Sequence, residues 1–234
     1  FHLKQLKTKL TSQCKYCGGK GCTRCAMEFD LHTKYAQAGI PIKYWDLSLA
    51  DLDPSGKGVK EVTNYVKKLK LAYLEGQGLL AYGKNGNGKT LCACAIGKEA
   101  IKQGYSVRFT FLGEIIAAFM NTMYDSKQRE RLKDDILGVD FLILDDIDKA
   151  YISEDSKYVN SILDTLFRTR VQNNLPVIMT ANKPINNILQ SNSEEVFTKS
   201  LLSLFDESLL SVLFYGSDKR SELKTEARKR FLED

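Results

Sequence analysis

The sequence has no apolar run that could cross a membrane. Its longest runs, such as Phe141 to Leu144, are far shorter than the roughly 20 residues that a membrane-spanning helix needs. No basic segment followed by an apolar one opens the chain, so we expect no secretory signal, a cytoplasmic location and no membrane partner. Internal repeats and low-complexity segments are also missing, which excludes collagen-like and solenoid architectures.

The composition is typical of a soluble globular protein. Hydrophobic residues make up 43% and charged residues 27% of the 234 residues. This length fits one ordinary α/β domain with a small appendage. The net charge of +5 argues only weakly for an anionic partner.

Two hydrophobic periods alternate along most of the chain. Short apolar runs predict strands at 79–82, 107–111, 141–144 and 177–180. Helical spacing and charge pattern predict helices at 59–73, 90–102, 113–124, 156–171 and 218–232. This alternation indicates a parallel sheet covered by helices on both faces, a three-layer α/β fold. Six residues are expected in the core: Cys92, Cys94, Ile115, Ile116, Phe119 and Met120.

The segment after the first predicted strand matches a phosphate-binding loop in full. It reads Gly83-Lys84-Asn85-Gly86-Asn87-Gly88-Lys89-Thr90, which is G-x-x-x-x-G-K-[ST] between a strand and a helix. Its glycines let successive backbone N–H groups point at phosphate oxygens, and the following helix adds its positive end. We therefore predict that the loop binds ATP, with Lys89 at the β- and γ-phosphates and the Thr90 hydroxyl on Mg²⁺.

Polar residues follow the third and fourth predicted strands. We expect Asp145 to orient Mg²⁺ through water, because this ion keeps much of its hydration shell, and Asp146 to polarise the attacking water. The alternative is a pair of surface aspartates that cap the next element. Asn182 fits a sensor between the attacking water and the γ-phosphate, although asparagine before Lys183-Pro184 is also a common turn former.

Together these motifs resemble AAA+ P-loop ATPases of the initiator and helicase-loader branch, in particular bacterial helicase loaders of the DnaC/DnaI type and their IstB-like cousins. The similarity runs from about residue 39 to 220. Its segments are Gly39-Ile40-Pro41, the phosphate loop, Leu142-Ile143-Leu144-Asp145-Asp146-Ile147, Asn173-Asn174-Leu175-Pro176-Val177-Ile178, Thr180-Ala181-Asn182 and Gly216-Ser217-Asp218-Lys219-Arg220. The resemblance implies that Gly39 to Pro41 form part of the adenine pocket. Because little chain follows Asn182, we expect the usual helical lid to be reduced or absent.

One residue that the resemblance implies is missing. Such ATPases usually carry an arginine, in a helix near residues 205–213, that reaches the γ-phosphate of the neighbouring subunit. This stretch contains no arginine here, which leaves Arg168, Arg170 and Arg220 as candidates. An arginine finger is worth about 10³–10⁵ in rate. We therefore expect slow ATP hydrolysis and a role for ATP mainly as a binding switch.

Four of the six cysteines form two closely spaced pairs, Cys14-x-x-Cys17 and Cys22-x-x-Cys25. Each pair bends the chain so that two thiolates converge, and the glycines of the short spacer permit the tight return. Four thiolates fit a closed structural Zn²⁺ site. An iron–sulfur cluster and free thiols are the alternatives. The resemblance implies a contact with the helicase, since some loaders carry an N-terminal zinc module.

The sequence predicts three units and two basic areas. The units are a four-cysteine zinc-binding module over 1–36, a linker with the N-terminal helix of the ATPase over 37–78, and the AAA+ core over 79–234. One basic area comprises Lys127, Arg129, Arg131 and Lys133, for which an ordinary solvated helix competes with a contact to single-stranded DNA. The other comprises Lys4, Lys7, Lys9, Lys15, Lys20 and Arg24, and suits nucleic acid or an acidic protein surface.

The resemblance implies an ATP-dependent loader that places a hexameric replicative helicase on single-stranded DNA during replication initiation, by self-association or by assembly on the helicase ring. One alternative is an IstB-like ATPase that regulates transposition on duplex DNA. Another is a helicase adaptor or inhibitor that binds ATP and scarcely hydrolyses it. The predicted zinc module favours the loader.

Overall fold

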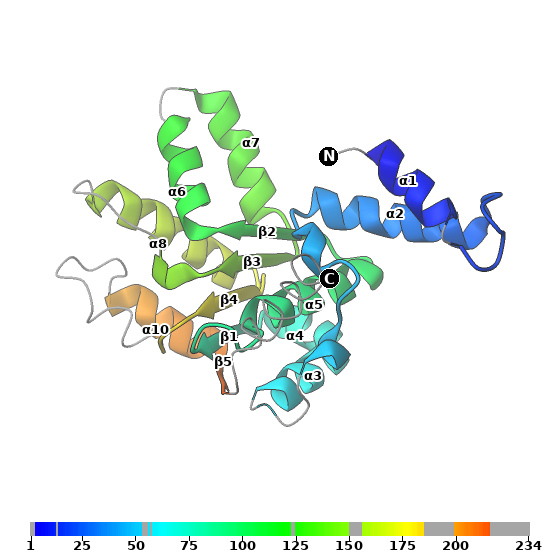
Figure 1. The fold of residues 1–234 in the computed structure, drawn as a ribbon. Helices are drawn as coiled ribbons and strands as arrows, with labels where there is room; N and C mark the ends of the chain where they lie inside the picture. Colours follow the sequence, from blue (N-terminus) through cyan, green and yellow to red (C-terminus); the bar gives the residue numbers. More distant parts are fainter. Residues whose placement is uncertain are drawn as a thin grey trace, which may run out of the picture.

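A computed structural model describes residues 3–12, 14–52, 56, 58–122, 125–149, 156–184 and 199–215. Five parallel strands form one sheet in the order β2-β3-β4-β1-β5 (Figure 1). They are β1 (Gly78–Gly83), β2 (Val107–Phe111), β3 (Phe141–Asp145), β4 (Val177–Ala181) and β5 (Leu209–Phe214). The predicted parallel α/β sheet is therefore confirmed. None of the helices in these ranges is long and apolar enough to cross a membrane.

Helices cover both faces of the sheet. Four of them share one hydrophobic cluster: α2 (Thr23–Gln37), α3 (Val59–Lys67), α4 (Leu69–Glu75) and α5 (Lys89–Lys102). On the other face lie α6 (Leu112–Asn121), α7 (Ser126–Leu137), α8 (Ser156–Gln172) and α10 (Lys199–Ser208). Strand β3 supplies Phe141 and Ile143 to the first cluster and Leu142 and Leu144 to the second, because successive side chains of a strand point to opposite faces.

Most of the predicted core residues are buried, and one is not. Cys92 and Cys94 are fully enclosed, and Ile115, Ile116 and Phe119 pack under α6. Met120 is 38% exposed, so its placement in the core was wrong. At about 100° per residue, Met120 lies roughly 90° from the centre of the buried stripe of α6 and falls at the stripe's edge.

Two segments differ from the sequence expectation. The helix predicted over 59–73 is divided at Lys68, whose backbone (φ −107°, ψ 22°) leaves the helical region between α3 and α4. Residues 205–213 are not one helix: α10 ends at Ser208 and β5 begins at Leu209. This strand pairs along the whole of β1, from Gly78 with Leu209 to Gly83 with Phe214. The predicted terminal helix, the segment 216–220 and the lid lie outside the described residues.

The N-terminal part forms a helical hairpin that projects beyond the sheet (Figure 1). Helix α1 (Leu3–Ser12) packs on α2, and the cysteine loop joins them. The far end of α2 belongs to the core, where Tyr35 and Ala38 join the cluster around α5. The predicted boundary of the zinc module at residue 36 therefore lies inside helix α2, which continues to Gln37.

Short turns of 3₁₀ helix connect α2 to the ATPase core. They are η1 (Ile42–Tyr44) and η2 (Leu49–Asp51), and a third, η3 (Ile147–Lys149), follows β3. Lys98 of α5 is 6% exposed and holds this connection in place. Its Nζ donates to the carbonyl oxygens of Tyr44 (2.6 Å), Trp45 (3.0 Å) and Leu47.

Candidate nucleotide site and cysteine cluster

The phosphate loop lies at the carboxyl ends of the strands, between β1 and α5. Its three glycines, Gly83, Gly86 and Gly88, all have positive φ (143°, 85° and 85°), which side chains rarely adopt. A Cβ at Gly83 would also lie 2.1 Å from the carbonyl oxygen of Phe214. Helix α5 begins within the last two residues of the loop, at Lys89. The loop therefore has the backbone and the helix end that anion binding requires.

Lys89 and Asn182 meet at this edge of the sheet although 93 positions separate them. The Lys89 side chain is 6% exposed, and its Nζ donates to the carbonyl oxygens of Gly83 and Lys84, both at 2.8 Å. The same Nζ is 3.3 Å from Oδ1 of Asn182, which follows β4. The sheet order places β4 beside β1. The ammonium and the amide can therefore contact one phosphate group.

Thr90 and Asp145 also lie together. The Thr90 hydroxyl donates to Oδ1 of Asp145 at 3.0 Å and is 3.2 Å from Oδ2. A hydroxyl that donates its proton to a carboxylate keeps its lone pairs for Mg²⁺, and the carboxylate can then hold a water of the ion's hydration shell. Asp145 is 4% exposed. The pair therefore fits one magnesium ion.

Thr180 is a site residue that the sequence reading missed. Its hydroxyl donates to Oδ1 of Asp145 at 2.5 Å and accepts the backbone N–H of Asp146 at 2.9 Å. Asp146 has a φ of 52°, uncommon for a residue other than glycine, and this second bond holds its backbone there. The signal in the sequence was a polar side chain inside the otherwise apolar strand β4.

Asp148 is a second missed residue. Its Oδ2 accepts the backbone N–H of Asn182 at 3.1 Å. Because Asp148 belongs to η3, just after β3, this bond ties the end of β3 to the end of β4. The backbone of the proposed sensor Asn182 is thus held by a side chain of η3, the turn that follows the neighbouring strand.

The arginine candidates have different surroundings. Arg170 is fully buried in α8, and its guanidinium donates to the carbonyl oxygens of Ile136, Leu137, Asp140 and Pro176. Burial lowers its pKa to about 10. A side chain enclosed in this way cannot reach another subunit, so Arg170 as a candidate finger was wrong. Arg168 pairs with Asp164 of the same helix at 2.6 Å, and Arg220 lies outside the described residues.

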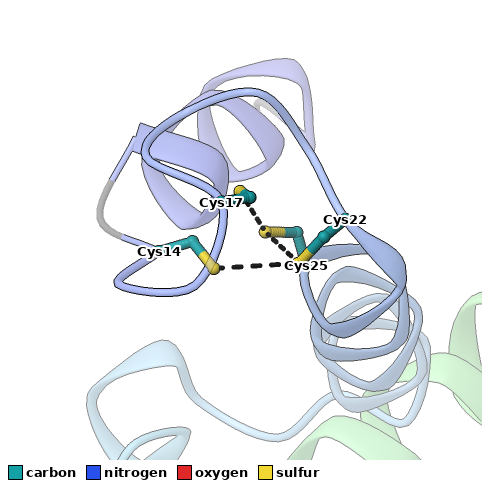
Figure 2. Close-up of side chains that lie close together, drawn as sticks. All are labelled: Cys14, Cys17, Cys22 and Cys25. Atoms are coloured by element: carbon teal, nitrogen blue, oxygen red, sulfur yellow. Dashed lines mark hydrogen bonds between the residues drawn. The ribbon is translucent and has the colours of Figure 1, made fainter.

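The four N-terminal cysteines converge on one point (Figure 2). Their Sγ atoms all lie within 4.8 Å of one another, with 3.9 Å for Cys14–Cys22 and 3.7 Å for both Cys17–Cys25 and Cys22–Cys25. Thiolates about 2.3 Å from a tetrahedral Zn²⁺ are separated by about 3.8 Å. The spacing therefore fits a single ion and is too long for a disulfide, whose sulfurs are about 2.05 Å apart.

Hydrogen bonds in the cluster shift the pKa values of two thiols in opposite directions, because the Cys25 thiol, whose pKa is raised to about 12, interacts with Cys14. The pKa of Cys14 is lowered to about 7, first by the backbone N–H of Tyr16 and then by the Cys25 thiol. Only Cys25 of the four is buried, while the other three are half-buried.

The basic residues between β2 and β3 lie on α7. Lys127, Arg131 and Lys133 are exposed, whereas Arg129 is half-buried and donates to the carbonyl oxygen of Thr122 at 3.3 Å. A contact of this helix with DNA stays a prediction.

Known proteins are similar to this chain in sequence and in fold. The family described as IstB-like ATP binding protein matches residues 57–212. The replicative helicase loader DnaC of Escherichia coli K12 is 28% identical over 142 residues, 60% of this chain and 55% of DnaC. An insertion-sequence IS21-like ATP-binding protein of Bacteroides fragilis is 28% identical over 174 residues, 73% of this chain and 62% of the relative. The matches thus span 55% and 62% of the length of these two relatives.

A solved structure has a similar fold. The crystal structure of DnaI superposes with a TM-score of 0.62 at 20% identity, over 77% of this chain and 94% of that one. The phosphate loop, Thr90, Asp145 and Asn182 all stand at the strand ends where an ATP-binding fold of this kind needs them. Because the family match covers two thirds of the sequence, this chain belongs to the IstB-like ATP-binding protein family, within the AAA+ P-loop fold.

Proposed function

We propose that this protein is an ATP-dependent loader of a hexameric replicative helicase onto single-stranded DNA. The similarity to the replicative helicase loader DnaC supports this proposal. The observation that carries the ATP dependence is the meeting of Lys89 with Asn182 and of Thr90 with Asp145, which joins β1, β3 and β4 at one site. ATP bound there would contact the ends of three strands at once.

Each residue of the site has a distinct task. Backbone N–H groups of the phosphate loop and the Lys89 ammonium bind the β- and γ-phosphates. Thr90 and Asp145 would hold Mg²⁺, which would supply positive charge to stabilise the phosphoryl group during its transfer. Asp146 accepts a proton from the attacking water, whose oxygen bonds to the γ-phosphorus while the bond to the β–γ bridging oxygen breaks. Asn182 orients that water and donates to the γ-phosphate.

Slow ATP hydrolysis fits a protein in which bound ATP acts as a conformational switch. The sequence has no arginine between Arg170 and Arg220, so α10 and β5 present none to a neighbouring subunit. Without such a residue the γ-phosphate persists for longer, and it stabilises one arrangement of the β1, β3 and β4 ends over another. The switch would set when the loader holds the helicase and when it releases it.

The cysteine cluster would supply the attachment to the helicase. Zn²⁺ bound by Cys14, Cys17, Cys22 and Cys25 would contribute folding free energy on the order of 10 kcal/mol. Cys22 and Cys25 sit at the start of α2, so metal binding would fix the loop against that helix.

Assembly with a helicase tests the proposal. Mass photometry of the purified chain with a hexameric replicative helicase from the same source should show a larger complex with ATP and Mg²⁺. The Lys89→Ala and Cys17→Ser variants should lose it, and Lys102→Ala, an exposed change at the other end of α5, should keep it. An unaltered helicase hexamer at all ATP concentrations would refute the loader.

The family assignment favours one second candidate, an ATPase that regulates transposition on duplex DNA. The relative from Bacteroides fragilis supports it. The two functions differ in the DNA that ATP-bound protein prefers. A loader should bind single-stranded oligonucleotides more tightly than duplexes of the same length, and a transposition regulator should show the reverse and coat long duplexes.

A further inference from the structure

The excess positive charge of the chain is concentrated at its N-terminal end. Residues 1–37 carry seven lysines and arginines against two acidic residues, which equals the net charge of +5 of the whole chain. The rest of the sequence is therefore balanced. Between Cys14 and Met27 there are three basic residues, Lys15, Lys20 and Arg24, and no acidic one. This end of the chain therefore carries the charge that attracts a polyanion.

An exposed aromatic stack occupies the same surface. The Tyr16 ring is 74% exposed, and the guanidinium carbon of Arg24 lies 3.9 Å from the ring centre. Arg24 itself is exposed, as are Lys15, Lys20 and Met27. An aromatic ring so open to solvent is not part of a core, and the cation on one face strengthens its attraction for a further π system.

The cysteine pairs hold this stack in position. Tyr16 lies between Cys14 and Cys17, and Arg24 lies between Cys22 and Cys25. Sulfurs of the two pairs lie 3.7–3.9 Å apart. The convergence of the pairs therefore brings the Tyr16 ring and the Arg24 guanidinium together. The stack is therefore preorganised, which reduces the entropy lost when a ligand binds.

We propose that this surface, formed by Lys15, Tyr16, Lys20 and Arg24, binds single-stranded nucleic acid. A base stacks on Tyr16, which Arg24 backs, while Lys15 and Lys20 contact phosphates on either side. Acidic groups of a protein would match the lysines alone, whereas a single strand supplies both phosphates for the lysines and a flat base for the exposed ring. The inference deepens the proposed function and rests on it for the choice of DNA, because a loader must meet the strand that enters the helicase.

The two kinds of contact give separate signatures. Stacking of a base on an aromatic ring is typically worth about 5- to 150-fold in affinity, so Tyr16→Ala should weaken binding by that factor. Each phosphate contact on a single strand adds about 0.7 to the slope of log affinity against log salt. The double variant Lys15→Ala/Lys20→Ala should therefore lower this slope by about 1.4.

Fluorescence anisotropy with labelled oligo-dT and the full zinc-loaded chain measures both effects. Tyr16→Phe should bind as the unaltered protein does, because it keeps the ring. Lys34→Ala is the charge control, since Lys34 lies further along α2 and pairs with Asp30 at 2.8 Å. Zinc content, determined for every variant, shows that the cysteine loop is intact. An oligonucleotide that carries 5-iodouracil should form a photo-adduct at Tyr16, located by mass spectrometry.

Three results would overturn the inference. One is unchanged oligo-dT affinity in Tyr16→Ala, and another is a photo-adduct confined to α7. The third is a Tyr16→Ala protein that binds oligo-dT only as weakly as Lys34→Ala does but no longer joins the helicase, which would identify a protein-docking surface. Failure of the proposed function is distinguishable from these. A chain that never joins a helicase, yet binds oligo-dT through Tyr16, would refute the loader and leave this site standing.

Discussion

Replacement of Arg170 by methionine should destabilise the fold, because this side chain donates to four backbone carbonyls in two segments that are far apart in the sequence. Its guanidinium donates to the carbonyl oxygens of Ile136 (2.9 Å), Leu137 (3.4 Å), Asp140 (3.0 Å) and Pro176 (3.1 Å). These carbonyls flank the start of β3 and the start of β4. Methionine keeps the length of the stem and removes every donor.

The expected loss follows from what the substitution leaves behind. Hydrogen bonds from a charged donor contribute about 1.5–3 kcal/mol each, and they are not additive within one cluster. The loss of these hydrogen bonds is offset in part, because the variant no longer has to transfer a charged guanidinium from water into the core. We expect the free energy of unfolding to fall by about 3–5 kcal/mol. Arg170→Lys keeps the charge and some donors, and should lose less.

Urea denaturation followed by circular dichroism measures this change. Arg168→Met is the matched control in the same helix, since an i,i+4 ion pair with Asp164 contributes only about 0.5 kcal/mol. The reasoning fails if Arg170→Met is as stable as the unaltered protein but inactive in ATP hydrolysis. Recovery of that activity on mixing with Lys89→Ala subunits would then show that Arg170 acts on a neighbouring subunit.

Three further predictions concern the site and the cysteine cluster. Thr180→Val removes the 2.5 Å bond to Asp145 and should lower kcat/KM for ATP by about 10-fold, with Thr180→Ser close to normal; an equal effect of both would contradict the role of the hydroxyl. Asp146→Asn should retain affinity for a fluorescent ATP analogue while phosphate release falls by about 10²–10⁴. Titration of the thiols with a mercurial should release one zinc per chain, read with a chromogenic chelator, and lower the helical circular dichroism signal.

The backbone geometry of the candidate nucleotide site was largely predictable because local sequence dictates it. The phosphate loop needs glycines with positive φ and a helix at a fixed offset, and both requirements appear in the residues themselves. The sequence also indicated that Asp145 and Asn182 follow buried strands. Their distances to Thr90 and Lys89 were beyond prediction, because they depend on the order of the strands in the sheet.

Strand β5 shows why other features were missed. Two of its three buried residues, Leu209 and Val212, follow Phe205 of α10 at spacings of four and three positions, which is the pattern of a helix, and only Phe214 breaks this spacing. No glycine or proline separates α10 from β5. Pairing with β1, more than 120 residues earlier, decides the structure of this stretch. Long-range pairing of this kind leaves no periodic signal in a short apolar run.

Helix α2 is a single continuous helix that connects the cysteine cluster to the ATPase core. Its 15 residues span about 22 Å, with Cys25 in the first turn and Tyr35 near the other end, where the Lys98 ammonium lies 5.9 Å from the Tyr35 ring centre. Lys98 belongs to α5, which begins at the phosphate loop. A tilt of about 10° at the core end would move the cysteine tip by about 4 Å. A small rotation of α2 caused by movement of α5 at the phosphate loop would thus produce a larger displacement of the cysteine cluster.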